Sequence, residues 1–181
     1  MLTQSWSSQI PEQPVLVVTR RLPATVELRI KLHYDARFNA NDHLYSRDEL
    51  VAESDGADAL LITQQDRMDA SLIWGLPESV RMIATLSVGF DHIDVKAAEA
   101  RGIAVTNTPG VLTDATADIA MLLLLGASRR ATEGQALVRG DTWNDPRPTD
   151  LLGWQLTGKI LGVYGMGRIG QEWPSGPGHL A

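Results

Sequence analysis

Residues 159–171 read Lys-Ile-Leu-Gly-Val-Tyr-Gly-Met-Gly-Arg-Ile-Gly-Gln, an apolar stretch that runs into Gly-x-Gly-x-x-Gly. This order predicts a β-strand over 160–164, followed by the turn and helix that open a dinucleotide-binding unit. In such a unit Gly165 permits the tight turn, Gly167 lets the backbone approach a pyrophosphate, and Gly170 lets the helix pack against the strand. The N–H groups at the start of that helix favour phosphate.

The sequence after this motif does not continue as the motif predicts. An acidic residue that binds a ribose hydroxyl is expected about 20 positions later, beyond Ala181. Residues 172–181 contain Pro174, Pro177 and two glycines, which disfavour a regular helix. With suitable codons, a frame offset by two bases encodes Val-Ala-Lys-Arg-Ala-Arg-Ala-Phe-Gly, an amphipathic helix ending in glycine. We interpret the tail as aberrant, from a frameshifted or misread gene, with a natural end as the alternative.

Composition excludes several classes of protein. A hydrophobic content of 44% and a charged content of 21% are typical of a soluble globular chain. The net charge of −6 argues against a nucleic-acid partner, and the absence of cysteine excludes disulfides and thiolate metal sites. Residues 1–14 have no apolar signal core, and the apolar run 119–125 is too short to span a membrane. We expect a cytoplasmic protein without a membrane or metal partner.

From residue 15 onward, short apolar strands alternate with helical patterns. Helices are expected after Pro23, at the capping box that Ser46 and Glu49 begin, after Asp69, and over 95–100 behind Asp94. The expected strands are 15–19, 35–38, 59–63, 82–86 and 103–106. This alternation predicts an α/β fold with a doubly wound parallel sheet.

A different pattern begins after the Asn-Thr-Pro-Gly turn at 107–110. Thr113 is expected to cap a long helix that runs to Arg130 or as far as Val138. Because this helix is apolar on all sides over 119–127, we expect it to be buried against another element. Residues 139–157 contain Gly140, Pro146, Pro148 and two tryptophans, and are expected to form an extended excursion before the strand at 160–164.

Four stretches together resemble the D-isomer-specific 2-hydroxyacid dehydrogenase family, close to the glyoxylate/hydroxypyruvate reductases. They are residues 86–95, 101–118, 151–158 and 165–171, and the resemblance extends over roughly 15–171. It implies reduction of small 2-keto acids, such as glyoxylate and hydroxypyruvate, to D-2-hydroxy acids by NAD or NADP cofactors. It also implies a homodimer.

The resemblance divides the chain into four parts. Residues 1–14, which are polar, are expected to be a disordered lead-in, and the resemblance implies that 15–106 are the N-terminal part of a flavodoxin-like substrate domain. Residues 107–171 are the incomplete start of a Rossmann NAD(P)-binding domain, and 172–181 are the aberrant tail.

The resemblance also implies roles for particular residues. Val88 and Gly89 match the loop whose N–H groups hold the substrate carboxylate, and a loop after a parallel strand suits a ligand. The alternative is that Gly89 merely turns the chain. Thr116 matches a position that faces the nicotinamide, although a helical threonine is more often a packed residue. The residues that match the pyrophosphate loop are Gly165, Gly167, Arg168, Ile169 and Gly170.

No catalytic residue is expected in this chain. The family uses an arginine, a glutamate and a histidine, and the resemblance implies that all three lie in the missing half. His92 lies near the substrate loop but is interpreted as structural, and no two histidines have metal-ligand spacing on one helix face. Two hypotheses follow. The chain is the inactive N-terminal half of an NAD(P)-dependent reductase, or it is a noncatalytic fragment or interaction module that dimerises through helix 113–130.

Overall fold

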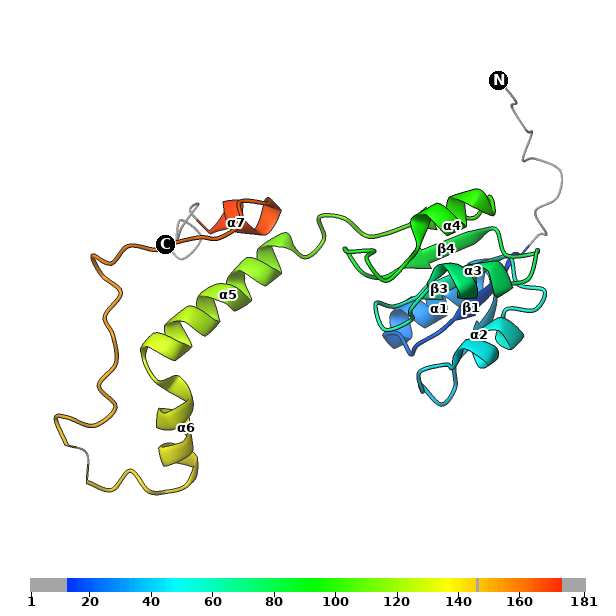
Figure 1. The fold of residues 1–181 in the computed structure, drawn as a ribbon. Helices are drawn as coiled ribbons and strands as arrows, with labels where there is room; N and C mark the ends of the chain where they lie inside the picture. The colour runs from blue at the N-terminus through cyan, green and yellow to red at the C-terminus, as the bar shows by residue number, and fades with distance from the viewer. Residues whose placement is uncertain (1–12, 146, 174–181) are drawn as a thin grey trace. The chain divides into compact units, whose positions relative to one another are not determined.

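The computed structural model describes residues 13–145 and 147–173 (Figure 1). These residues form two compact units, 13–109 and 110–173. Most of the lead-in predicted over 1–14 and most of the tail predicted over 172–181 lie outside the described residues.

The first unit is built on a five-stranded parallel sheet. Its strand order is β2-β1-β3-β4-β5, with neighbouring strands in register at Val17–Leu60 and Leu60–Ile83. The strands are β1 (Val15–Val18), β2 (Asp35–Phe38), β3 (Ala59–Ile62), β4 (Met82–Thr85) and β5 (Ala104–Thr106). This order is that of flavodoxin-like doubly wound sheets, so the predicted fold class is confirmed.

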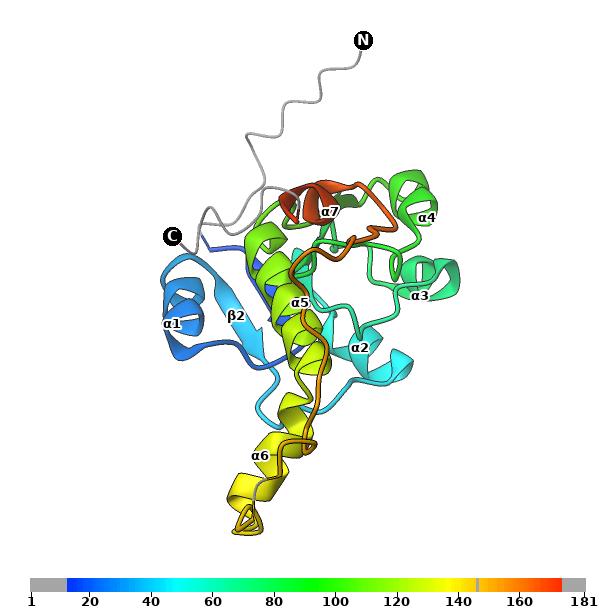
Figure 2. The same cartoon turned by 90° about the vertical axis from the view of Figure 1, so that its left-hand side faces the viewer.

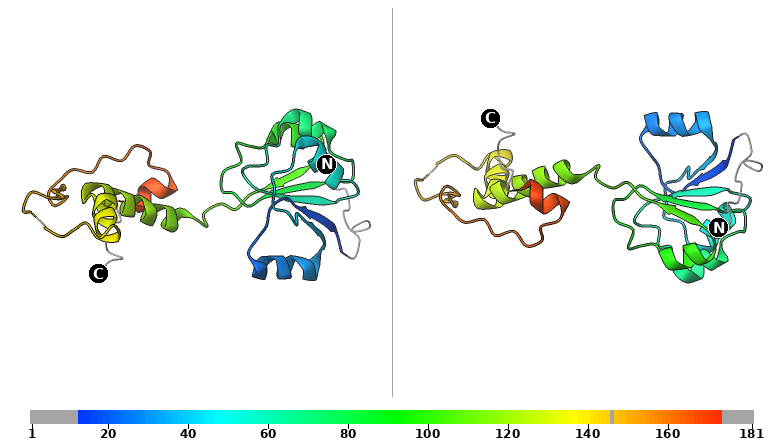
Figure 3. Two further views of the ribbon diagram at one scale, coloured as in Figure 1. Left: turned by 90° about the horizontal axis from the view of Figure 1, so that it is seen from below. Right: turned by 90° about the horizontal axis from the view of Figure 1, so that it is seen from above.

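Helices cover both faces of this sheet. They are α1 (Ala24–His33), α2 (Arg47–Glu53), α3 (Ala70–Gly75) and α4 (Val95–Ala100). Figure 3 shows the blue α1 on one face and the cyan-to-green α2, α3 and α4 on the other. Because side chains alternate along a strand, each strand supplies apolar residues to both layers. Leu16 and Val18 of β1 pack with Ile30 of α1, whereas Val17 belongs to the opposite cluster.

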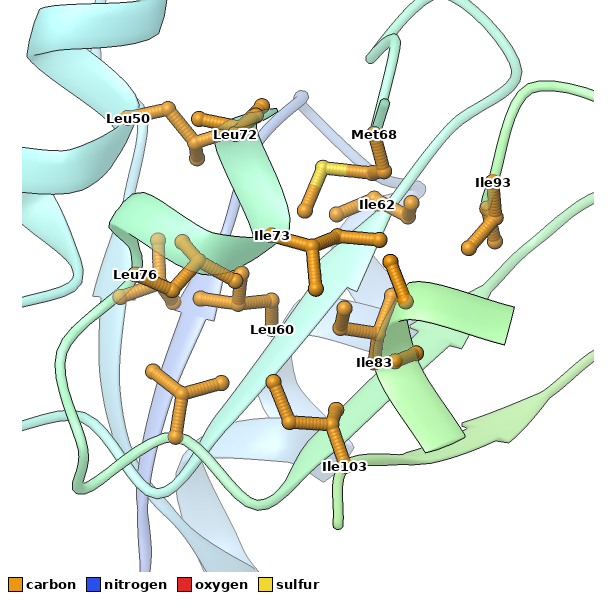
Figure 4. Close-up of a cluster of buried hydrophobic side chains, with 14 of the residues drawn as sticks. Leu50, Leu60, Ile62, Met68, Leu72, Ile73, Leu76, Ile83, Ile93 and Ile103 are labelled. Atoms are coloured by element: carbon orange, nitrogen blue, oxygen red, sulfur yellow. The ribbon is translucent and has the colours of Figure 1, made fainter. Parts of the chain in front are cut away.

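The larger cluster forms the core between the sheet and helices α2, α3 and α4 (Figure 4). Leu60, Ile62 and Ile83 of the central strands are fully buried there, together with Ile73 of α3 and Met68. This core fixes β3 and β4, and so fixes the position at which each strand ends and its following loop begins.

Three of the predicted helix caps are present. The side chain of Ser46 accepts from the N–H of Glu49, whose side chain reaches back to the N–H of Ser46, so the capping box is confirmed. Asp69 accepts from Leu72 at 2.9 Å, and Asp94 accepts from the N–H of Ala97 at 3.0 Å.

The second unit contains three helices, and the long predicted helix is wrong in two respects. It is divided into α5 (Thr113–Ser128) and α6 (Ala131–Arg139), because Arg130 adopts a left-handed φ of 53° that interrupts the helix. Its cap position is Leu112, and Thr113 is the first helical residue. The third helix, α7 (Arg168–Glu172), lies beside α5 in Figures 1 and 2.

The apolar middle of α5 is not buried as the sequence predicts. Ile119 is 55% exposed, Leu122 63% and Leu123 66%. Of the residues in α5, Ala117 is the one that is buried. The described part of the chain therefore leaves most of this apolar surface uncovered.

The strand predicted over 160–164 is also wrong. These residues are irregular, and Ile160 is 99% exposed. A β-strand is held by hydrogen bonds to a neighbouring strand, and within residues 147–173 no strand is present to pair with this one.

Candidate functional site

Two loops at the carboxyl edge of the sheet lie side by side. One follows β4 and contains residues 86–90, and the other follows β5 and begins at Asn107. They are neighbours because β4 and β5 pair in parallel, with Ala84 opposite Thr106. In open α/β sheets, ligands bind outside the carboxyl ends of the strands.

Successive carbonyl groups of the loop after β4 are each held by a donor. The N–H of Thr108 donates to the oxygen of Ser87 at 3.2 Å. The side-chain amide of Asn107 donates to the oxygen of Val88 at 2.7 Å, and the hydroxyl of Ser87 donates to the oxygen of Gly89 at 2.7 Å. Thr108 also donates its hydroxyl to Leu86 at 2.9 Å, so the loop is fixed along its whole length.

This pattern determines where the loop directs its N–H groups. In a planar trans peptide the C=O and the N–H point in opposite directions. Holding the oxygens of Ser87, Val88 and Gly89 therefore turns the N–H groups of Val88, Gly89 and Phe90 away from the donors that hold those oxygens. Within residues 13–145 and 147–173, these three N–H groups have no hydrogen-bond acceptor. A row of free backbone N–H groups is suited to an anion.

The glycine at position 89 is not needed to turn the chain. Its φ lies outside the left-handed region that favours glycine, and a β-carbon there would come no closer than 3.8 Å to its nearest neighbour, a side-chain oxygen of Asp91.

Asn107 and Thr108 are site residues that sequence reasoning missed. Their Asn-Thr-Pro-Gly sequence is interpreted there only as a turn. The signal that could have revealed them is their position directly after a predicted strand. Polar residues there lie close to the loop that follows the neighbouring strand.

The charged groups of this unit are largely committed to structural contacts. Arg101 donates to the carbonyl oxygens of Ile73 and Leu76, and Arg81 pairs with Asp58 at 3.0 Å. The half-buried His92 lies beneath the loop, with its Nε2 3.2 Å from the hydroxyl of Thr85. Burial lowers the pKa of His92, while the nearby carboxylates of Asp66 and Asp91 act in the opposite direction.

The glycine motif of the second unit forms a compact turn. Gly165 has a φ of 101°, a conformation that L side chains rarely adopt. A β-carbon at Gly170 would overlap the carbonyl of Gly165, so Gly170 packs against the turn itself rather than against a strand. At Gly167, which precedes α7, a β-carbon would meet open space. A pocket beside this turn is lined by Leu124 of α5, residues 161–165, Ile169, Gly170 and Trp173.

Arg168 and Ile169 begin α7, directly after the turn. Thr116 lies in the first turns of α5 and is exposed, so it is not a packed core residue.

No group of three or more histidine, aspartate or glutamate side chains arranged to hold a metal is found among the described residues. None of the helices described is long and apolar enough to cross a bilayer.

Comparison with known proteins agrees with these features. Residues 16–165 match the family described as D-isomer specific 2-hydroxyacid dehydrogenase, catalytic domain. A glycerate dehydrogenase of Hyphomicrobium methylovorum is 43% identical over 156 residues, which cover 86% of this chain and 48% of the relative. A glyoxylate reductase of Thermococcus litoralis is 40% identical over 163 residues, which cover 88% of this chain and 49% of the relative.

A solved structure gives the same result. The NADPH-dependent glyoxylate/hydroxypyruvate reductase of Sinorhizobium meliloti, determined in complex with NADP and malonate, aligns with a TM-score of 0.74 at 27% identity. The alignment covers 90% of this chain and 49% of that one. This chain spans about half the length of the relatives it matches. Because the family match extends over most of its residues, the chain belongs to the D-isomer specific 2-hydroxyacid dehydrogenase family.

Proposed function

We propose that this chain supplies the substrate-carboxylate site of an NAD(P)-dependent reductase that converts small 2-keto acids into D-2-hydroxy acids. The observation that carries the proposal is the row of free N–H groups at Val88, Gly89 and Phe90. Such a row can bind the carboxylate of glyoxylate or hydroxypyruvate, with the N–H groups of Val88 and Gly89 as the main donors. The names of the relatives, glyoxylate reductase and glycerate dehydrogenase, support this substrate class.

The glycine turn of the second unit fits a dinucleotide, NAD or NADP. Open space at Gly167 lets a pyrophosphate approach the backbone, while Gly165 and Gly170 form the tight turn. Arg168 and Ile169 complete the contact, and Thr116 is assigned to the nicotinamide side. When bound, the dinucleotide supplies the hydride for reduction. The complex of the Sinorhizobium meliloti relative with NADP supports this class of cofactor.

The 181-residue chain alone is expected to be inactive. Reduction of a keto group needs a proton donor at the keto oxygen, which contributes about 10²–10⁴-fold. Among the described residues, His92 is the histidine beside the loop, and its Nε2 faces Thr85 rather than the N–H row. In the family the acid, its glutamate and the carboxylate-binding arginine come from the other half.

The exposed leucines of α5 favour a second candidate role. Leu122 and Leu123 are more than 60% exposed on a helix with little buried surface. They suit a homodimer contact of the complete protein, or of a noncatalytic fragment that dimerises through residues 113–130. We expect both forms in the cytoplasm.

A chimera tests the proposed function. Residues 16–165 replace the matching part of the Hyphomicrobium glycerate dehydrogenase, and oxidation of NADH and NADPH is measured with glyoxylate and with hydroxypyruvate. We expect keto-acid-dependent turnover by the chimera and none by the 181-residue chain. A folded chimera that binds cofactor but has no turnover would refute the substrate site. Robust turnover by the chain alone would refute its inactivity.

A further inference from the structure

Three side chains form a continuous chain of hydrogen bonds beneath the loop of residues 86–90, which we call the carboxylate loop. Nε2 of His92 lies 3.2 Å from the hydroxyl of Thr85, the last residue of β4. That hydroxyl lies 2.7 Å from the hydroxyl of Ser87, which donates to the carbonyl of Gly89 at 2.7 Å. Thr85 is only 2% exposed, so water does not readily replace these contacts.

The direction of every proton in this chain follows from its last member. The carbonyl of Gly89 can only accept, so the single O–H of Ser87 is used there. The short contact between the hydroxyls of Ser87 and Thr85 then requires the proton of Thr85. With its own proton used, Thr85 can only accept from His92, and Nε2 of His92 must carry hydrogen.

The opposite arrangement fails at the central contact. If Nε2 of His92 were an acceptor, the proton of Thr85 would point to the imidazole. The hydroxyl oxygens of Thr85 and Ser87 would then face each other at 2.7 Å with no proton between them. Two bare lone pairs at that distance repel, and a polar group left unpaired in a buried place is costly.

We propose that His92 is a positioning residue of the carboxylate loop. Its Nε2–H, acting through Thr85 and Ser87, fixes the Gly89–Phe90 peptide and so aims the N–H of Phe90 into the anion site. The inference rests on the proposed function only where it takes the loop's ligand to be a carboxylate.

The surroundings of His92 suit this role. Its carbonyl accepts from the N–H of Met68 at 2.8 Å, and the neighbouring Ile93 bridges to Met68. Both of those side chains are buried, so the backbone of His92 is anchored to the core. Burial of the imidazole lowers its pKa against the opposing influence of Asp66 and Asp91. When the ring is neutral it has one proton, and the hydrogen-bond chain places that proton on Nε2.

The first test uses the unmodified 181-residue chain. It is prepared with ¹⁵N-labelled histidine, and the ring-nitrogen signals of its four histidines are recorded by long-range ¹H–¹⁵N correlation as the pH is varied. At pH values above the pKa of His92, its ring is expected to be in the Nε2–H form. An Nδ1–H form at that pH would overturn the proposal without any variant.

The second test uses variants and the binding of oxamate, an unreactive analogue of a small 2-keto acid. His92→Phe keeps a ring without a donor, Ser87→Ala removes the last donor, and His92→Gln keeps a donor near Nε2. Loss of one such hydrogen bond is expected to weaken oxamate binding by about three- to tenfold in H92F and S87A. H92Q is expected to stay within about twofold of the parent chain.

A double variant and a matched control complete the test. Because both residues act through one peptide, H92F combined with S87A is expected to be no weaker than either alone. His43→Phe removes an exposed histidine elsewhere in the unit and is expected to change nothing at the loop. Additive losses of oxamate affinity in the double variant, or a loss in H92Q equal to that in H92F, would overturn the proposal that His92 acts through Thr85 and Ser87.

The two proposals fail in different ways. If the carboxylate site is wrong, oxamate shifts no loop amide in any variant. The parent chain still shows the Nε2–H form of His92, and H92F and S87A still show an altered Phe90 amide signal. If the positioning role of His92 is wrong, oxamate binds with equal affinity to the parent chain, H92F and S87A.

Discussion

The side-chain amide of Asn107 donates to the main-chain oxygen of Val88 at 2.7 Å, which joins the loop after β5 to the loop after β4. This bond holds the oxygen of the peptide that joins Val88 to Gly89, so the N–H of Gly89 points away from the amide of Asn107. One side chain of the loop after β5 therefore orients a group that we propose binds the substrate.

The first prediction concerns this bond. Asn107→Asp keeps the size of the side chain but replaces the donor with a carboxylate that repels the oxygen of Val88. We expect oxamate binding to weaken by about tenfold, which corresponds to about 1.4 kcal/mol. Amide chemical shifts are used to measure the affinity.

Thr108→Ser is the matched control, because it keeps the hydroxyl that donates to Leu86. It is expected to bind like the parent chain. Equal affinity of N107D and the parent chain would show that Asn107 does not orient the site.

The second prediction separates two glycines of the turn before α7. Gly170→Ala introduces a β-carbon that overlaps the carbonyl of Gly165, so the turn should open and the amide signals of residues 165–172 should shift widely. Gly167→Ala points into open space and should leave those signals nearly unchanged. The prediction fails if both variants give the same spectrum.

The third prediction concerns the core of the first unit. Leu60 is fully buried in the central strand β3, and Leu60→Ala is expected to lower the free energy of unfolding by about 2–5 kcal/mol. Ile83→Val removes one methyl group from the adjacent strand and is expected to cost about 0.5–1.5 kcal/mol. Urea unfolding followed by amide signals of residues 13–109 measures both, and equal costs would contradict this packing.

The fourth prediction concerns pH. Burial lowers the pKa of His92 in the folded chain below its ordinary value of 6.5, so the unfolded chain binds the proton more readily. The stability that this shift contributes is fully present above pH 6.5, and is lost as the pH falls from 6.5 through the folded pKa. Asp66 and Asp91 limit the size of the effect.

H92Q is expected to lack this part of the pH dependence in unfolding measurements made on either side of pH 6.5. An unchanged pH dependence in H92Q would show that His92 binds protons equally well in the two states.

The elements of the first unit could be predicted from sequence because their signals are local. Apolar runs such as 59–63 become strands wherever a neighbouring strand is available, and Ser46 and Asp69 cap helices through groups a few residues away. The strand predicted at 160–164 failed because pairing depends on a neighbour, which local pattern cannot supply. The break in the helix at Arg130 was likewise not predicted, since nothing in the local sequence signals a left-handed residue there.

The site was only partly predictable. The resemblance points to Val88 and Gly89, and both lie in the loop whose N–H groups are free. The contribution of Asn107 comes from the pairing of β4 with β5, and that of His92 comes from the backbone bridge between Met68 and Ile93. Those contacts are set by the folded sheet, so no spacing along the chain reveals them.

The central claim is that the loop after β4 binds a carboxylate through its backbone. A ¹H–¹⁵N titration of the 181-residue chain with oxamate tests it most directly, with neutral oxamide as the matched probe. Saturable downfield shifts of the Val88, Gly89 and Phe90 amides are expected with oxamate and not with oxamide. No shift at these amides, or equal shifts with both probes, would contradict the account.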